Sequence, residues 1–139
     1  MKKRVISTIV VLALFVSMLP GCMFSGGDDD ANLNIVDDNY RNYYEIFVGS
    51  FYDSDGDGMG DLNGVAEKLD YITDLGCNGI WLMPIMPSPT YHKYDVEDYE
   101  NVDSAYGTAE DFKKLVDACH EKGIRLVIDL VMNHSSSKH

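Results

Sequence analysis

The sequence contains little positive charge. It has 11 lysine and arginine residues against 23 aspartate and glutamate residues, which gives a net charge of −12 at pH 7. Nucleic acids and anionic lipid surfaces are bound mainly through lysine and arginine side chains. The composition therefore argues against both as partners, and we expect no nucleic-acid function.

Cysteine is also scarce, with three residues in the chain. Cys77 and Cys119 could pair in an exported protein, but the sequence does not fix the geometry that a disulfide requires. Both lie in apolar patterns, as buried free thiols do. Two unpaired buried cysteines are therefore the favoured interpretation.

No hydrophobic run is long enough for an ordinary transmembrane helix. The apolar stretch VISTIVVLALFVSM is short for a spanning segment. Basic residues precede it and LPGC follows, so residues 1–21 have the three parts of a secretory signal. The end of this segment resembles the lipobox of bacterial lipoproteins, in which Cys22 would be acylated. Pro20 is unusual in that box, so ordinary signal cleavage and an uncleaved anchor are the alternatives.

Residues 22–40 read as a polar tether, with SGGDDDANLN as its most polar part. We therefore expect an exported protein that meets the membrane only through a lipid anchor on the outer side of the cell membrane, or that is secreted.

The stretch DSDGDGMGD, residues 53–61, crowds four aspartates into nine positions. Carboxylates at this spacing repel one another unless a hard cation such as calcium binds between them. An EF-hand is excluded because Gly64 stands where its last carboxylate should be, and because a strand-like run precedes the loop. The alternative is an acidic turn in solvent that binds no metal. The predicted calcium ligands are Asp53, Asp55, Asp57, Asp61 and the carbonyl of Met59.

Strand-like and helix-like segments alternate after residue 42. Strands are predicted near residues 43–51, over the apolar run 77–84 and over 124–132. A helix is predicted from Leu62 to Leu75, ended by Gly76, with an apolar stripe. That stripe consists of Val65, Leu69, Ile72 and Leu75.

A second helix is predicted from Thr108 to Gly123. Thr108 and Asp111 have the spacing of a capping box. The apolar face of this helix consists of Phe112, Leu115, Val116 and Cys119.

This order of elements predicts an α/β fold with a parallel sheet. The first strand-to-helix turn lacks the glycine fingerprint of dinucleotide-binding sheets, which disfavours a doubly wound fold. Polar residues gather after the carboxyl ends of all three strands, as they do on the active face of a (β/α)₈ barrel.

Several motifs then carry a specific resemblance. DLVMNH, residues 129–134, is similar to the first conserved region of the α-amylase family, glycoside hydrolase family 13. Residues 79–108 resemble the second barrel strand of that family and the long loop after it, and the aspartate loop resembles the calcium loop of many members. The resemblance implies that residues 41–139 are the N-terminal portion, β1-α1-β2-α2-β3, of a truncated (β/α)₈ TIM barrel.

The resemblance also implies roles for individual residues. Tyr94 would stack on the glucosyl ring before the scissile bond, and His134 would hydrogen-bond a hydroxyl of the same ring. Asp129 would help to order the catalytic groups, and as a buried carboxylate it needs a partner. Asn133 would be architectural here, and Trp81 would belong to the barrel core.

The reaction implied is retaining hydrolysis of α-1,4-glucosidic bonds in starch-like glucans, in which one carboxylate attacks while another protonates the leaving oxygen. In the family these carboxylates come from later strands, so we expect no catalytic residue in this chain and no activity from it alone. The expected substrate is an α-glucan and the expected cofactor is calcium.

One position in the loop after the second predicted strand bears on specificity within the family. Tyr91 stands three places before Tyr94, where enzymes that act on chain ends tend to have an acidic residue. This favours an endo-acting α-amylase. Neopullulanase-like or oligo-α-glucosidase activity, an inactive fragment and, outside the family, a calcium-dependent binding module are the alternatives.

Overall fold

The computed structural model describes residues 38–139. The predicted signal, the lipidation site Cys22 and most of the predicted tether lie outside these residues. A short 3₁₀ helix, η2 (Asp38–Tyr40), begins the described part. Within this part of the chain, no helix has the length and apolar character that crossing a membrane requires.

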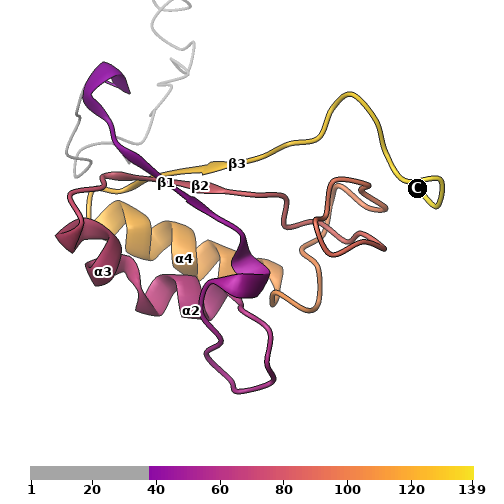
Figure 1. Ribbon diagram of the computed structural model, residues 1–139, viewed down its shortest axis with the longest axis horizontal. Coiled ribbons are helices and arrows are strands. Elements are labelled where there is room, and N and C mark those ends of the chain that lie inside the picture. Colours follow the sequence, from indigo (N-terminus) through magenta and orange to yellow (C-terminus); the bar gives the residue numbers. More distant parts are fainter. Residues whose placement is uncertain (1–37) are drawn as a thin grey trace, which may run out of the picture.

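Three parallel strands form the centre of the fold, as predicted (Figure 1). They are β1 (Tyr43–Ile46), β2 (Gly79–Leu82) and β3 (Arg125–Ile128), and β2 lies between the other two. Tyr43, Gly79 and Arg125 start a shared register. The carboxyl ends of all three strands therefore meet at one edge of the sheet, from which the long loops leave.

The α-helices that follow β1 cover the same face of this sheet (Figure 1). They are α2 (Leu62–Glu67), α3 (Leu69–Asp74) and α4 (Ala109–Glu121). Apolar side chains from both layers meet in one core, which the strict apolar spacing of the sequence already indicated. Its most buried members include Ile46, Val65, Leu69, Ile72, Ile80, Leu82, Leu115, Cys119 and Ile124.

The predicted capping box begins α4. The Thr108 hydroxyl accepts a hydrogen bond from the Asp111 N–H at 3.2 Å, and the Asp111 carboxylate accepts one from the Thr108 N–H at 3.0 Å. These bonds satisfy two backbone donors that the first helical turn would otherwise leave free. Hydrogen bonds from Thr108, with those from Lys114, lower the pKa of Asp111 to about 2.

The single helix predicted over residues 62–75 is wrong, because the structure has two short helices there. At Lys68 the N–H bonds back to the carbonyls of Val65 and Ala66, so the regular helical ladder is interrupted. Val65, Leu69 and Ile72 are buried as predicted, but Leu75 is 54% exposed. Gly76 ends α3 in a left-handed conformation, φ 83°, as expected.

All three predicted strands are longer than the observed ones, and β2 covers only residues 79–82 of the predicted 77–84. After Ile46 the chain turns into a 3₁₀ helix, η3 (Val48–Ser50), in which the Phe51 N–H bonds to the Val48 carbonyl. The chain therefore leaves the sheet five residues early. β3 ends at Ile128, and the last ladder bond is from the Asp129 N–H to the Leu82 carbonyl, 2.8 Å.

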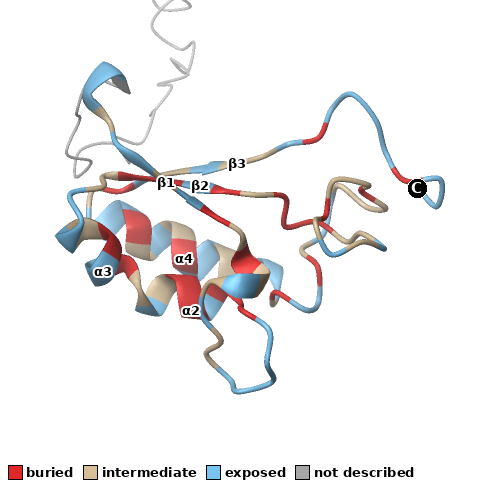
Figure 2. Ribbon diagram, in the orientation of Figure 1, coloured by how far each residue is buried: buried red, intermediate tan, exposed pale blue. Residues whose placement is uncertain are grey.

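The face of the sheet opposite the helices is open (Figure 2). Glu45, Trp81 and Val127 form one cross-strand row on it, and all three are exposed. The Trp81 indole is 43% exposed and lies on the face that a (β/α)₈ barrel turns inward, so its predicted place in the barrel core stays a prediction. The alternation of a strand places Ile80 and Leu82 toward the helices and Trp81 away from them.

Both described cysteines are free, as favoured from the sequence. Cys119 is buried in the core, and this burial raises the pKa of its thiol to about 12. Cys77 is only half-buried, so the expectation of two buried thiols holds for one of them.

Candidate functional site

Three segments carry polar side chains at the carboxyl edge of the sheet. They are residues 47–61 after β1, residues 83–107 after β2 and residues 129–139 after β3. Ligand sites of parallel α/β sheets form at this edge because the loops from successive strands converge there.

The aspartate loop folds around its own carboxylates. Asp53 accepts hydrogen bonds from the N–H groups of Gly56 (2.6 Å) and Gly58 (2.8 Å), and Asp55 accepts one from Asp57 (3.1 Å). The hydrogen bonds that Asp53 accepts lower its pKa, and the bond from Gly58 is the largest cause. Residue 60 must be a glycine, because the Cβ atom of any other residue would lie 2.0 Å from the Val48 carbonyl oxygen.

The structure brings three of the four predicted aspartates together. Carboxylate oxygens of Asp53, Asp55 and Asp61 lie within 4.8 Å of one another, which is close enough to share one cation. Asp57 is not in this group, and its carboxylate accepts a hydrogen bond from the Met59 N–H at 2.7 Å.

Asp61 has a second role at the start of α2. Its carboxylate accepts hydrogen bonds from the Gly64 N–H (2.7 Å) and from the N–H and hydroxyl of Ser54 (both 2.8 Å). Burial alone would raise the pKa of Asp61, but these hydrogen bonds outweigh it and lower the pKa. The same residue thus caps a helix and fixes one end of the aspartate loop.

Tyr94 and Asp129 meet across two segments that are 35 residues apart. The Tyr94 hydroxyl donates a hydrogen bond of 2.6 Å to the Asp129 carboxylate. This bond is the main cause that raises the pKa of Tyr94 to about 12. Asp129 is half-buried at the end of β3, and Tyr94 is the partner that its carboxylate was expected to need.

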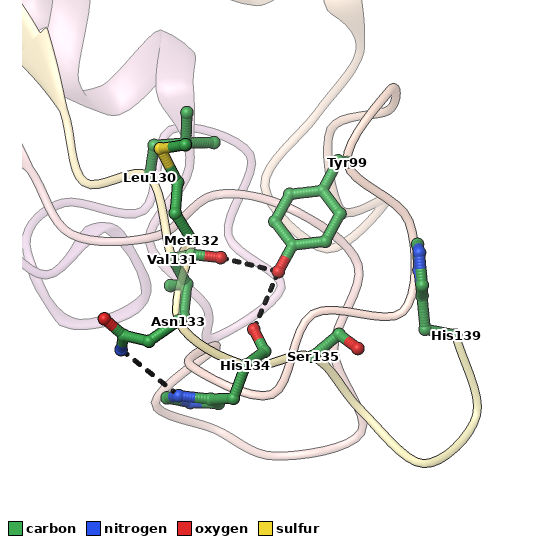
Figure 3. A pocket seen from close by; sticks show the side chains of 8 residues that line it. All are labelled: Tyr99, Leu130, Val131, Met132, Asn133, His134, Ser135 and His139. Atoms are coloured by element: carbon green, nitrogen blue, oxygen red, sulfur yellow. Dashed lines mark hydrogen bonds between the residues drawn. The ribbon is translucent and has the colours of Figure 1, made fainter.

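His134 and Asn133 lie next to each other on the segment after β3, where both are exposed. Their side chains approach to 3.4 Å, and they line a pocket of about 520 Å³ with Tyr99 (Figure 3). The Tyr99 hydroxyl points to the carbonyls of Val131 (2.6 Å) and His134 (2.8 Å). Among the described residues, no hydrogen bond joins His134 to Tyr94 or Asp129.

Comparison with known proteins decides the family. The family model described as "Alpha amylase, catalytic domain" matches residues 45–139. The chain belongs to the α-amylase family.

Individual relatives agree with this assignment. Alpha-amylase 3 of Dictyoglomus thermophilum is 55% identical over 102 residues, which are 72% of this chain and 20% of that protein. An alpha-glucosidase of Schizosaccharomyces pombe is 52% identical over 97 residues, 69% of this chain and 17% of the relative. The solved structure of Eubacterium rectale Amy13B has a TM-score of 0.73 and 59% identity, and the match covers 80% of this chain and 22% of Amy13B.

The chain therefore spans about a fifth of the length of these α-amylase-family proteins. The predicted family and the predicted fold, an N-terminal portion of the barrel, are both confirmed. The roles predicted for Tyr94, His134, Asp129 and Asn133, and the calcium ligands, stay predictions.

Sequence reasoning missed the residues that shape the loop around Tyr94. The Asp95 carboxylate accepts hydrogen bonds from the hydroxyls of Thr90 and Ser88, the latter at 2.7 Å, and these bonds lower the pKa of Asp95. The Tyr94 N–H donates to Nδ1 of His92 at 3.1 Å. The close spacing of serine, threonine and aspartate in SPTYHKYD was the signal for such a side-chain-bonded turn.

An ion pair inside the same loop was also missed. Lys93 and Asp103 are both buried, with Nζ and Oδ2 2.5 Å apart. No local pattern identifies this pair, because ten residues separate the partners and a charged residue is usually solvated.

Proposed function

We propose that the protein containing this chain hydrolyses α-1,4-glucosidic bonds in starch-like polysaccharides by a retaining mechanism. The observation that carries the proposal is the Tyr94–Asp129 pair, at the carboxyl edge of a parallel sheet in a chain of the α-amylase family. In such folds the reacting groups gather at this edge.

The residues of this chain would bind and orient the substrate. The face of the Tyr94 ring suits the apolar face of a glucosyl unit, and its hydroxyl is held by Asp129, so the ring has one orientation. His134 is exposed and lines the pocket of Figure 3, where it can offer a ring nitrogen to a sugar hydroxyl. The nucleophile and the acid, which a retaining enzyme needs about 5 Å apart, would come from later strands of the barrel, as the family resemblance implies.

The aspartate loop is proposed as a calcium site. Carboxylate oxygens are the ligands that calcium prefers, and three of them already lie within 4.8 Å of one another in Asp53, Asp55 and Asp61. The fit supports a cation that holds the loop together after β1. The carbonyl of Met59 and the carboxylate of Asp57 remain candidates to complete the coordination.

Export is proposed from the N-terminal residues alone. A signal of lipoprotein type with acylation at Cys22 would hold the enzyme at the outer surface of the cell membrane, with the α-glucan as its partner there. Cleavage without acylation would release it.

The deciding experiment uses the full-length product of the gene that encodes this chain. We expect it to lower the viscosity of soluble starch before reducing ends accumulate. We also expect products with retained α configuration, which NMR of the anomeric protons measures. Replacing Tyr94 with alanine should reduce kcat/KM strongly, while Tyr40→Ala, far from this edge at the start of the described chain, should not. An inactive full-length protein, or products of inverted configuration, would refute the proposal.

Hydrolysis at chain ends is the second candidate, because an alpha-glucosidase is among the relatives at 52% identity. Such an enzyme would release glucose from maltose and would leave the viscosity of starch nearly unchanged in the early reaction.

A further inference from the structure

Lys93 has a backbone conformation that glycine normally occupies. Its φ is 65°, and it is the one non-glycine residue with a positive φ in the part of the chain that the structure describes. A side chain in this left-handed region crowds the following carbonyl, which costs free energy for every residue except glycine. The lysine side chain must therefore contribute something that offsets this strain.

The lysine side chain is directed inward and is almost fully enclosed. Lys93 is 9% exposed, and its ammonium group lies 2.5 Å from the Asp103 carboxylate. The same ammonium group lies 5.2 Å from the centre of the Tyr106 ring, within the range of a cation–π interaction. Lys93 thus ties the tip of the loop after β2 to its returning arm.

Both partners of Lys93 are fixed by the rest of the fold. The Asp103 N–H bonds to the Ile85 carbonyl at 2.8 Å. Tyr106 is 2% exposed, and its carbonyl accepts the N–H of Leu62, the first residue of α2, at 3.0 Å. The anchor for Lys93 is therefore part of the packed core and not a mobile surface group.

We propose that Lys93 is a positioning residue for Tyr94, which holds the tyrosine ring toward Asp129 through the ion pair with Asp103. Lys93 directly precedes Tyr94, so its left-handed turn sets the direction in which the chain presents the next side chain. On the other side, the Tyr94 hydroxyl reaches Asp129 at 2.6 Å. This inference rests on the proposed function, in which Tyr94 binds the glucosyl ring.

A purely stabilising role explains the arrangement less well. Removing two charges from water costs nearly as much as their attraction returns, so a buried ion pair is a weak source of stability and a better source of fixed geometry. Glycine would satisfy the backbone at this position without strain. Only the anchoring of the loop requires the long charged side chain.

Lys93→Gly distinguishes a positioning role from a stabilising one. It relieves the backbone strain at residue 93 and at the same time removes the side chain that anchors the loop. In the full-length enzyme we expect kcat/KM on maltooligosaccharides to fall about tenfold or more, because a misplacement of about 1 Å can cost roughly 100-fold. The loss should divide between kcat and KM as it does for Tyr94→Ala. Lys113→Gly, which breaks an exposed ion pair with Asp117 on α4, controls for the loss of a lysine and should leave both constants unchanged.

The same substitution in a Tyr94→Ala background tests whether Lys93 acts through Tyr94. We expect it to change kcat/KM by less than about twofold there, since residues that act as a unit are not additive. An unchanged kcat/KM for Lys93→Gly in the wild-type background, or an equal loss in both backgrounds, would overturn the proposal. If Lys93→Gly does not fold, Asp103→Asn, which keeps the lysine and weakens its anchor, is held to the same two criteria.

Crystal structures of the wild type and of the variant separate this proposal from the proposed function. We expect the Tyr94 hydroxyl to leave hydrogen-bond distance of Asp129 in the variant, whatever substrate the enzyme takes. A Tyr94 hydroxyl that stays 2.6 Å from Asp129 would overturn the positioning role. A normal kcat/KM for Tyr94→Ala would instead overturn the proposed role of Tyr94 in substrate binding and leave the positioning of the ring to be judged by the structures.

Discussion

Removal of calcium should destabilise the full-length enzyme through the aspartate loop. A ligand that binds only the native state at about 100 times its dissociation constant stabilises that state by about 2.7 kcal/mol. In a domain of barrel size this corresponds to a fall in Tm of about 5 °C, since each kcal/mol shifts Tm by about 2 °C in larger domains. We therefore expect chelator to lower Tm by at least this amount.

The structure predicts different results for individual aspartates. The Asp55 carboxylate is exposed and accepts one hydrogen bond within the loop, from Asp57. Asp55→Ala should therefore abolish the response to calcium and change the Tm in chelator little. Asp61 also caps α2 through Gly64, so Asp61→Ala should cost about a further 1 kcal/mol even without calcium, as the loss of a helix cap does.

Differential scanning calorimetry of the wild type and of both variants, with calcium and with chelator, measures these effects. Asp57→Ala is the informative control, because the sequence pattern includes Asp57 among the ligands and the three-carboxylate group does not. An unchanged wild-type Tm in chelator would refute the calcium site. A Tm of Asp55→Ala that still rises with calcium would refute the ligand set.

Three other predictions concern the same loops and helices. Thr108→Ala removes the hydroxyl of the capping box and should cost about 1 kcal/mol in urea unfolding; no change in the midpoint would contradict the cap. The pKa of Asp111 is lowered to about 2, so its contribution to stability is complete above the ordinary aspartate value near pH 4 and is lost as the pH falls toward 2. As the pH falls from about 4 to about 2, the Tm of Asp111→Asn should therefore fall less than that of the wild type. Equal slopes of Tm against pH would contradict the lowered pKa of Asp111. Tyr99→Phe removes the donor to the carbonyls of Val131 and His134 and should raise KM while the fold, followed by circular dichroism, is kept; an unchanged KM would remove Tyr99 from the site.

Local chemistry made parts of this fold predictable. The capping box of α4 needs only two residues three positions apart, and the structure has it as predicted. The apolar stripe of Val65, Leu69 and Ile72 depends only on helical spacing, and all three are buried. The interruption at Lys68 was not predictable in this way, since the stripe continues across it.

The geometry around Tyr94 depends on contacts between distant segments. Thirty-five residues separate Tyr94 from Asp129, and ten separate Lys93 from Asp103. The family resemblance singled out Tyr94 and Asp129 individually, and the structure adds that they bind each other. Nothing in the local sequence marks Lys93, because a lysine in a polar loop normally stays in solvent.

The open face of the sheet leads to a last prediction, for residues 41–139 expressed alone. Parallel sheets are normally covered on both faces, but here Trp81 is 43% exposed and Val127 39% exposed on the uncovered side. Ordering the backbone costs about 1 to 2 kcal/mol of conformational entropy per residue. Apolar area that stays in water contributes nothing to offset this cost. We therefore expect broad urea unfolding. We also expect no hydrolysis of starch, because the two carboxylates of the retaining mechanism come from later strands in the family.

Trp81 is the one tryptophan of the sequence, so its fluorescence reports this face directly in the isolated segment. We expect an emission maximum close to that of a solvated indole, efficient quenching by iodide, and binding of a dye specific for apolar surface. Tyr43, next to the same face at the start of β1, is 40% exposed, and Tyr43→Trp would give a second reporter in a Trp81→Phe background. A sharp unfolding transition at low protein concentration, with Trp81 shielded from iodide, would mean that the segment buries this face by itself. The physical argument from the uncovered sheet would then be wrong.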